Sequence, residues 1–396
     1  MTRARKHASM APHAVMGLRA GIALLAFATP FAQPALGAPD STAIAIASVA
    51  DPPIHISFLD RYEFLSKEAS QADRTAEELS GLTRVDDEHF FAIGDAHACL
   101  HRLTVHIDRA SGKILSAKLD RPLLLLDGKG HPYDDSKDGK DREGVILDPK
   151  SRSVWISNEQ TEGDRHHSCI EQHRLSDGRL LALIRWDSDP MLRVFEHGRR
   201  NRGWESLARN EAGTEIWTGN EEALEVDGPT STDHEGGVIR LQKFDGAMHP
   251  VAQYAYVLDP YPAKIRGPLF LLDREIVGLS ELLVLPGGRL IALERAFAGL
   301  VTGEAGLRNR IYLVDFKDAT DVSKGDLAGG LDGRKFTPVG KTLLWSRDWG
   351  VTNSNFEGMA LGPRLAGGDR VLLLVADNNG GTSQTLVALR VSGLPR

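Results

Sequence analysis

The sequence predicts an all-β fold, a β-propeller of four-stranded blades. Three observations support this prediction: a short motif that recurs five times, strand-forming runs in each copy, and turn residues between the runs. The copies begin 62 to 76 residues apart, counted from Ser80 to Glu143 and onward to Glu357. A long-period repeat of several short strands is typical of propeller blades.

The repeated motif begins with a polar residue, usually Glu, followed by a short strand-like run. A turn and a second hydrophobic run come next, and the second run ends in Asp, Asn or Glu. The polar positions are Ser80, Glu143, Glu205, Glu281 and Glu357. Because the innermost strands of all blades line one channel, we expect these side chains to approach one another around the axis.

Turn pairs such as Asp177-Gly178 and Asp245-Gly246 separate the expected strands. In the second to fourth repeats the strands are expected at 144–147, 153–157, 169–175 and 180–186; at 207–209, 215–218, 237–244 and 251–258; and at 282–285, 290–293, 310–316 and 341–346.

The last repeat shows three strands, at 358–361, 370–375 and 385–391. We expect the N-terminal run 54–64 to supply the missing fourth strand, which closes the ring and removes the exposed sheet edges. This count gives five blades. A sixth blade within residues 223–275 remains an alternative. Residues 318–338 are expected to be a surface insertion.

The N-terminal segment differs from the rest of the chain. Arg3, Arg5, Lys6 and Arg19 precede an apolar stretch that is interrupted by Pro30, which is typical of a secretory signal. We therefore expect a signal peptide at 1–38, a leader at 39–53 and a single propeller domain at 54–396. The mature protein is expected to be periplasmic or secreted.

Composition limits the classes of partner. The chain has 396 residues, 41% of them hydrophobic and 26% charged, with a net charge of -7. The negative charge argues against a nucleic-acid partner. No second long apolar run suggests a membrane span, and we expect a monomer.

Cys99 and Cys169 could form a disulfide in an oxidising compartment or remain two buried thiols.

Several short runs resemble those of the phytase-like propeller family, exported bacterial proteins described as having esterase-like activity of phytase. The resemblance covers roughly residues 55–392 and rests on 79–82, 141–144, 201–208 and 355–361. It implies a β-propeller and, by extension to the phytases proper, calcium-dependent hydrolysis of phosphate esters. Those phytases have six blades, one more than the repeats counted here.

Carboxylates that cluster around the axis would raise one another's pKa, and their negative charge would have to be balanced. A bound cation could balance it, or arginines such as Arg142 and Arg295 could. Protonation of some of the carboxylates is the third possibility. Oxygen ligands suit a hard cation, and calcium is the expected ion. The expected metal ligands are Glu143, Glu205, Glu281, Glu357, Asn158 and Asn220. The alternative is that each Glu hydrogen-bonds the backbone of its own blade.

Arginines precede the third copy of the motif. Arg199, Arg200 and Arg202 lead into Glu205, so we expect them at the rim of the channel, where guanidinium groups could bind a phosphate or carboxylate. Salt bridges to neighbouring carboxylates are the alternative. A serine-hydrolase mechanism has no support, because the nucleophile motif Gly-x-Ser-x-Gly is absent from the sequence.

Two classes of function follow. The first is an exported metal-dependent hydrolase of small anionic esters, phosphoric or carboxylic, with Glu143, Glu205 and Glu357 as catalytic groups. The second is a non-catalytic propeller that binds a ligand or partner and uses the ion structurally. A lactonase is a lesser alternative. The effect of a chelator on hydrolysis and on the fold would separate the two main classes.

Overall fold

We describe the fold from a computed structural model of the chain. The described residues are 53–65, 78–94, 97–133, 141–159, 161–162, 165–166, 168–232, 234–260, 276–298, 306–349, 355–378 and 383–395. All of them belong to one compact unit, Ser41–Arg396. The expected signal peptide at 1–38 and all but the last residue of the leader lie outside the described residues. Within the described ranges, no helix has the length and apolar character that a membrane span requires.

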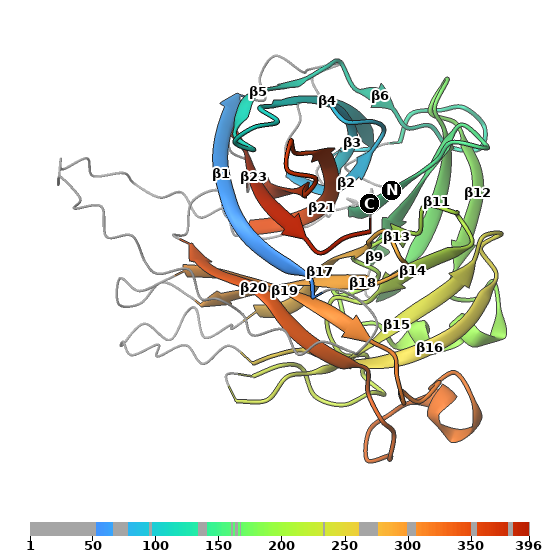
Figure 1. Cartoon of the computed structure of the whole chain (residues 1–396). Coiled ribbons are helices and arrows are strands. Elements are labelled where there is room, and N and C mark those ends of the chain that lie inside the picture. The colour runs from blue at the N-terminus through green and yellow to red at the C-terminus, as the bar shows by residue number, and fades with distance from the viewer. Residues whose placement is uncertain are drawn as a thin grey trace, which may run out of the picture. The chain divides into compact units, whose positions relative to one another are not determined.

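Five antiparallel sheets follow one another around a ring (Figure 1), which confirms the propeller and the count of five blades. Blade one contains β2 (Leu79–Arg84), β3 (His89–Gly94), β4 (Cys99–Ile107) and β5 (Ile114–Leu119), with β6 (Leu123–Leu124) paired to β4. Blade two contains β7 (Arg142–Asp148), β8 (Ser153–Asn158), β11 (Cys169–Arg174) and β12 (Leu180–Arg185). A separate hairpin joins β9 (Thr161–Glu162) to β10 (Arg165–His166).

The remaining blades have the same order from the inner strand outward. Blade three contains β13 (Ala208–Arg209), β14 (Glu215–Gly219), β15 (Val238–Asp245) and β16 (Pro250–Val257). Blade four contains β17 (Ile276–Val284), β18 (Leu290–Ala298), β19 (Gly306–Asp315) and β20 (Gly340–Trp349). Blade five contains β21 (Asn355–Arg364), β22 (Arg370–Asp377), β23 (Ser383–Ser392) and β1 (His55–Leu65).

The N-terminal strand closes the ring as expected. β1 pairs antiparallel with β23, and the register runs from His55 opposite Ser392 to Leu65 opposite Ser383. Ile56 and Phe64 are buried and pack into two different hydrophobic clusters of the fold. The first and last strands of the described residues are therefore neighbours in one sheet.

Strand lengths differ from the expectation mainly in blade four. β19 begins at Gly306 rather than 310, although Arg308, Asn309 and Arg310 give its first half a polar character. These residues still form ladder pairs with both β18 and β20, and Arg308 forms an ion pair with Asp348 on β20. Sheet pairing therefore overrides the low intrinsic strand preference of these residues.

Each interface between neighbouring blades holds its own hydrophobic core. Leu100 of blade one and Ile156 of blade two share one cluster, and Leu103 and Leu373 share the cluster between blades one and five. Equivalent clusters fill the other three interfaces. Because every blade contributes to two clusters, removing one blade would expose apolar surface on both of its neighbours.

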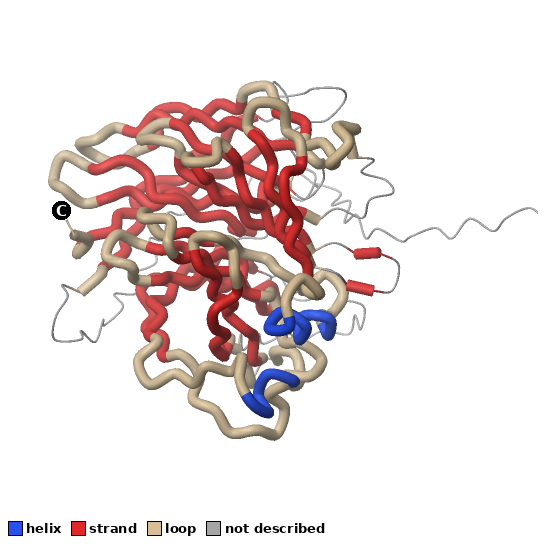
Figure 2. The backbone as a smooth tube through the Cα atoms, turned by 90° about the vertical axis from the view of Figure 1, so that its right-hand side faces the viewer, coloured by secondary structure: helices blue, strands red, loops and turns tan. Residues whose placement is uncertain are grey.

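Two short 3-10 helices, drawn blue in Figure 2 beside the mainly red strands, lie in connecting segments. They are η1 (Pro190–His197) and η2 (Gly325–Gly329). η2 lies within 318–338, and Arg240 of β15 fixes this segment to blade three. Arg240 donates to the Leu327 carbonyl at 2.9 Å while forming a fully buried pair with Asp227.

The inner strands approach closely where they meet around the axis. A Cβ atom added at Gly81 of β2 would lie 2.2 Å from the Glu143 carbonyl oxygen, and one at Gly144 of β7 would lie 2.4 Å from the Leu207 nitrogen. Both approaches involve backbone, so no side chain fits there. The Gly that follows the polar residue in the first, second and fifth motifs is thus a packing requirement, since a Cβ atom at Gly358 would likewise lie 2.6 Å from the Ser80 carbonyl oxygen. The third and fourth motifs have Ser206 and Leu282 at this position.

Both cysteines are buried, and they are not joined by a disulfide. Cys99 begins β4 and Cys169 begins β11. Of the two alternatives left open by the sequence, the structure has the pair of buried thiols.

Candidate functional site

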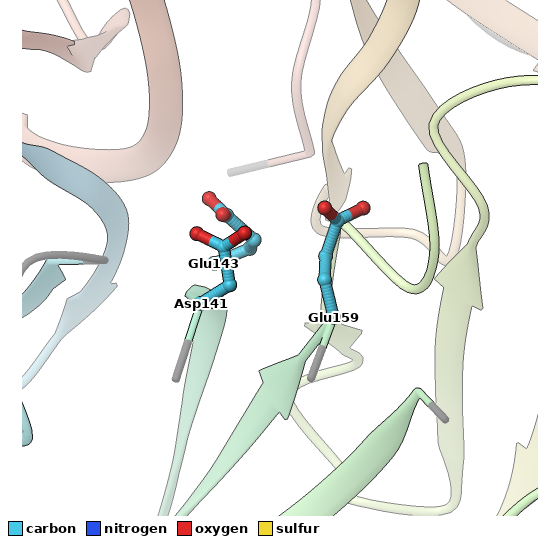
Figure 3. A group of neighbouring side chains, drawn as sticks. All are labelled: Asp141, Glu143 and Glu159. Atoms are coloured by element: carbon cyan, nitrogen blue, oxygen red, sulfur yellow. The ribbon is translucent and has the colours of Figure 1, made fainter. Parts of the chain in front are cut away.

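Carboxylates gather where the inner strands begin and the second strands end. Asp141 and Glu143 lie at the start of β7, and Glu159 directly follows β8. Since these strands are antiparallel and pair Arg142 with Asn158, the start of one lies beside the end of the other. Figure 3 shows the three carboxylates pointing into the same space.

Blade three repeats this arrangement. Glu205 precedes β13 and Glu221 follows β14, and two backbone bonds hold the segments together. Glu205 N donates to the Gly219 oxygen at 3.0 Å, and Glu221 N donates to the Gly203 oxygen at 2.8 Å. The same position in two blades therefore supplies one carboxylate from the inner strand and one from the second strand.

The carboxylates form two groups in which selected oxygens all lie within 4.8 Å of one another. One group contains Asp141, Glu143 and Glu159, and the other contains Glu159, Glu205 and Glu221. Glu159 belongs to both groups and so joins the two blades. We call these five residues the acidic mouth.

Arg295 of β18 connects the acidic mouth to blade five. Its Nη2 donates to Glu221 Oε1 at 2.9 Å and lies 3.6 Å from Glu205 Oε1. Its Nη1 donates to Glu357 and, at 2.9 Å, to Asn355 Oδ1. One guanidinium group thus bridges side chains of blades three and five from its own position in blade four.

The site carries more negative than positive groups. Arg202 also donates to Glu221, so Arg202 and Arg295 together face the five carboxylates of the mouth and Glu357. If all six acids were ionised, the two guanidinium groups would leave an excess of four negative charges. Such an excess must be relieved by protonation or by a bound cation.

The pKa values of these groups divide according to their partners. Burial, with the neighbouring carboxylates, raises the pKa of Glu143, Glu159 and Glu205 well above the usual value. Burial likewise raises the pKa of Asp141 to about 6. Burial also opposes ionisation of Glu221, but Arg202 and Arg295 outweigh it and lower the pKa of that residue.

The donor set suits a hard cation. Glu159 is 1% exposed, and its Oε1 is buried without a hydrogen-bond partner. The mouth offers carboxylate oxygens alone, which calcium and magnesium prefer over nitrogen or sulfur ligands. An excess of buried negative charge and an unpartnered oxygen are together the features that a bound cation would satisfy.

Glu357 lies beside the mouth rather than within the two groups. It accepts from Ser80 Oγ at 3.2 Å and from Asn355 Nδ2 at 2.9 Å, besides its ion pair with Arg295. Asn355 Nδ2 also donates to Asp377 at 3.0 Å. Ser80, the first-repeat equivalent of the glutamates, thus faces the axis as the repeat predicts and holds Glu357 in place.

Glu281 occupies a different environment. Its Oε1 accepts from the backbone nitrogens of Leu207 at 3.1 Å and Leu282 at 2.9 Å, and a backbone bond from Met359 also reaches this carboxylate. These nitrogens belong to blades three, four and five. The side chain links three blades through their backbones, close to the structural alternative that the sequence left open.

The two asparagines are both fully buried. Asn158 ends β8 beside the mouth. The Asn220 amide is engaged by backbone, since Nδ2 donates to the Glu222 carbonyl and Oδ1 accepts from Arg240 N at 3.0 Å.

The three arginines of 199–202 have different roles. Arg202 alone reaches the mouth, through Glu221. Arg199 donates to the Ala223 oxygen at 2.9 Å and to the Gly228 oxygen at 3.0 Å, so it holds a loop. Arg200 is exposed.

Sequence reasoning missed three members of the mouth, Asp141, Glu159 and Glu221. A usable signal was present, because the second hydrophobic run ends in Asn158-Glu159 in one repeat and in Asn220-Glu221 in the next. The same Asn-Glu pair at equivalent positions predicts that the side chain beyond the strand end also faces the axis.

A protein-family model described as "Phytase-like: Esterase-like activity of phytase" matches residues 74–380. Comparison with curated proteins gives no match.

Among solved structures, a streptogramin B lyase has 10% identity and a TM-score of 0.32, covering 84% of this chain and 99% of that chain. A PQQ-bound aldose sugar dehydrogenase from Streptomyces coelicolor has 12% identity and a TM-score of 0.32, with coverage of 86% and 100%. An endo-arabinase from Bacteroides thetaiotaomicron has 11% identity and a TM-score of 0.41, with coverage of 79% and 93%. Likenesses at these scores carry no argument about activity.

Proposed function

The chain belongs to the phytase-like family with esterase-like activity of phytase, and from this premise we propose that it is a calcium-dependent hydrolase of small phosphoric or carboxylic esters. The observation that carries the proposal is the acidic mouth, in which five carboxylates meet with an unpartnered oxygen on Glu159. We further propose that the protein acts as an exported, periplasmic or secreted monomer, with a signal peptide at 1–38, a leader at 39–53 and one domain at 54–396.

Asp141, Glu143, Glu159 and Glu205 would hold the ion, because their carboxylates are the ones that lie close together without an arginine hydrogen bond. Calcium bound there would polarise an ester oxygen and lower the pKa of a bound water molecule. Glu281 has a structural role in this scheme, since its carboxylate accepts hydrogen bonds from backbone nitrogens of three blades.

Proton transfer is assigned with the ion in place. The raised pKa of Glu143 and Glu205 belongs to the ion-free site, where burial and neighbouring carboxylates oppose ionisation. As ligands of calcium, both residues would be ionised and would hold the ion and orient the attacking water. The proton that this water releases would pass to the leaving alcohol.

Positive groups position the anion. Arg202 is 25% exposed, so its guanidinium group can contact both Glu221 and a substrate phosphate or carboxylate. Arg295 is less exposed, at 15%, and it orients Glu205, Glu221 and Glu357. Glu357 is therefore proposed to act through this network, held by Ser80 and Asn355.

A matched pair of variants tests the proposal. Glu205→Gln should weaken calcium binding at least tenfold and abolish hydrolysis, because a buried ligand is lost while the shape is kept. Glu281→Gln should leave calcium affinity unchanged and lower stability by about 1–3 kcal/mol through its backbone partners. Calorimetric titration with calcium, thermal unfolding and an ester and phosphoester panel give the readouts.

Equal calcium affinity in wild-type protein and Glu205→Gln would exclude the proposed site. Hydrolysis that survives a chelator in folded protein would exclude a metal-dependent mechanism.

A second function is favoured by one feature, the linkage of blades through this site. Glu159 joins the carboxylates of blades two and three, and Arg295 joins blades three, four and five. An ion at such a junction would stabilise a non-catalytic propeller that binds a ligand or partner. In that case chelation should lower the unfolding temperature strongly, and no ester of the panel should be hydrolysed.

A further inference from the structure

The inner strands line a second space with the residues that follow their acidic starts. This cavity has a volume of 420 Å³, within the range of small-molecule sites. Its wall is mainly apolar, and its apolar residues include Leu82, Val145, Leu147, Leu207, Leu282 and Met359. We call it the axial cavity.

Three arginines and one acid also line the axial cavity. They are Arg84, Arg209, Arg370 and Glu211, so the lining carries an excess of two positive charges. Arg84 donates to Asp87 at 2.6 Å, and Arg209 lies 3.8 Å from Asp148. These two guanidinium groups each have a carboxylate partner outside the lining.

Arg370 has no such partner. It is 7% exposed, and its Nε and Nη2 donate to one carbonyl, that of Gly362, at 3.2 and 2.8 Å. Among the salt bridges of the described residues, none involves Arg370. Asp87 and Glu211 act on Arg370 from beyond salt-bridge distance. A buried guanidinium group without a directly paired carboxylate attracts an anion.

Two further observations point to the same place. The Nε of Arg84 is buried without a hydrogen-bond partner, so a second donor of the lining is unused. Burial, together with Arg84 and Arg364, lowers the pKa of Arg370 and outweighs the opposite effect of Asp87 and Glu211. An anion between Arg370 and Arg84 would relieve the repulsion between these two groups.

We infer that the axial cavity binds an amphipathic carboxylate, with its carboxyl group on Arg370 and Arg84 and its hydrocarbon part against the apolar wall. The cavity walls favour this class over a purely inorganic anion, because most of the lining offers no hydrogen bond. An uncharged hydrocarbon would leave Arg370 unpaired. The site is separate from the acidic mouth and needs no calcium.

The test uses the full chain in the presence of a chelator, with hexanoate, octanoate and decanoate as probes in calorimetric titrations. Affinity should rise about threefold to fourfold for each added methylene group that becomes buried. Arg370→Gln should weaken octanoate binding at least tenfold. Arg174→Gln is the matched control and should bind like the wild type, because Arg174 lies outside the lining and forms an ion pair with Asp177.

Three results would overturn the inference: no octanoate binding at millimolar concentration, an affinity independent of chain length, or equal binding by Arg370→Gln. Inorganic phosphate that binds as tightly as octanoate, or octyl phosphate that binds more tightly, would also reject the carboxylate assignment.

If Arg370→Gln fails to fold, the inference is tested with Leu147→Ser instead. The affinities of this variant for hexanoate, octanoate and decanoate are then compared with those of the wild type. This variant should reduce the gain per methylene while leaving acetate binding unchanged, and an unaltered gain would contradict the proposed wall.

Discussion

The acidic mouth and the axial cavity are built from the same inner strands, yet they have opposite charge. The carboxylates stand at the strand starts, and Arg84 and Arg209 stand at the ends of β2 and β13. Arg209 follows Glu205 by four residues, about 13 Å along an extended chain. A propeller repeat therefore fixes which positions face the axis, whereas the residue at each position decides the chemistry of each end.

The two regions also differ in how their charges are paired. Arg295 contacts carboxylates contributed by two other blades. Arg370 donates to a carbonyl of its own blade, that of Gly362, and forms no salt bridge within the part of the chain that the structure describes. We infer that the acidic mouth holds blades together, whereas the guanidinium group in the axial cavity is available to a ligand.

The largest expected effect would destroy both regions at once. Deleting residues 54–64 removes β1 and leaves the edge of β23 unpaired, so the ring should open and the protein should aggregate. Size-exclusion chromatography and thermal unfolding measure this, and a chain that begins at residue 53 is the control. A deleted form that stays monomeric and unfolds cooperatively would show that the ring does not depend on β1.

A pair of arginine substitutions should separate the two regions. Arg295→Gln leaves the buried Glu357 without its guanidinium partner and Glu221 with Arg202 alone, and it should cost about 3–5 kcal/mol. Arg370→Gln removes a guanidinium group without a carboxylate partner and should change stability by less than about 1 kcal/mol. Denaturant unfolding gives both values. Equal losses of free energy of unfolding in the two variants would contradict the inference that the acidic mouth, but not the axial cavity, holds blades together.

A smaller effect is expected on substrate binding at the mouth. Arg202→Met should raise KM about tenfold to a hundredfold with a smaller change in kcat, because the lost contact is to a charged group of the substrate. Arg200→Met is the matched control, since Arg200 is exposed two residues away. A normal KM in Arg202→Met would place substrate binding elsewhere.

The smallest effect concerns pH. The pKa of Asp141 is about 6 in the folded protein, above the ordinary value of 3.8. Between these values the folded chain binds more protons than the unfolded chain, so this group lowers the free energy of unfolding as pH rises. In chelator-treated protein, Asp141→Asn should remove that contribution between about pH 4 and 6. Identical pH profiles for wild type and variant would contradict the raised pKa.

The ring could be predicted well because the sequence signals for strands and turns are local and recur in every blade. Strand runs, turns and the run 54–64 each have their own signal, and β7, β8 and β1 lie within one or two residues of the expected ranges. The early start of β19 was missed, because its polar residues become strand only through pairing with both neighbours.

The site was predicted in part. The repeat brought Glu143 and Glu205 to the axis, but it could not show that Glu281 faces backbone nitrogens. That difference arises from blade packing, since Glu281 lies against Leu207 of another blade. The axial cavity had no sequence signal, because the isolation of Arg370 depends on which carboxylates fail to reach it.

The pairing of β1 with β23 has a consequence for synthesis. At roughly 5–20 residues per second, a ribosome needs about 20–80 s to make this chain. For most of that time, roughly 16–65 s, β1 waits without its partner, because β23 ends only at Ser392. Any chaperone that serves this protein must therefore protect an unpaired N-terminal strand, with its apolar Ile56 and Phe64, until β23 emerges.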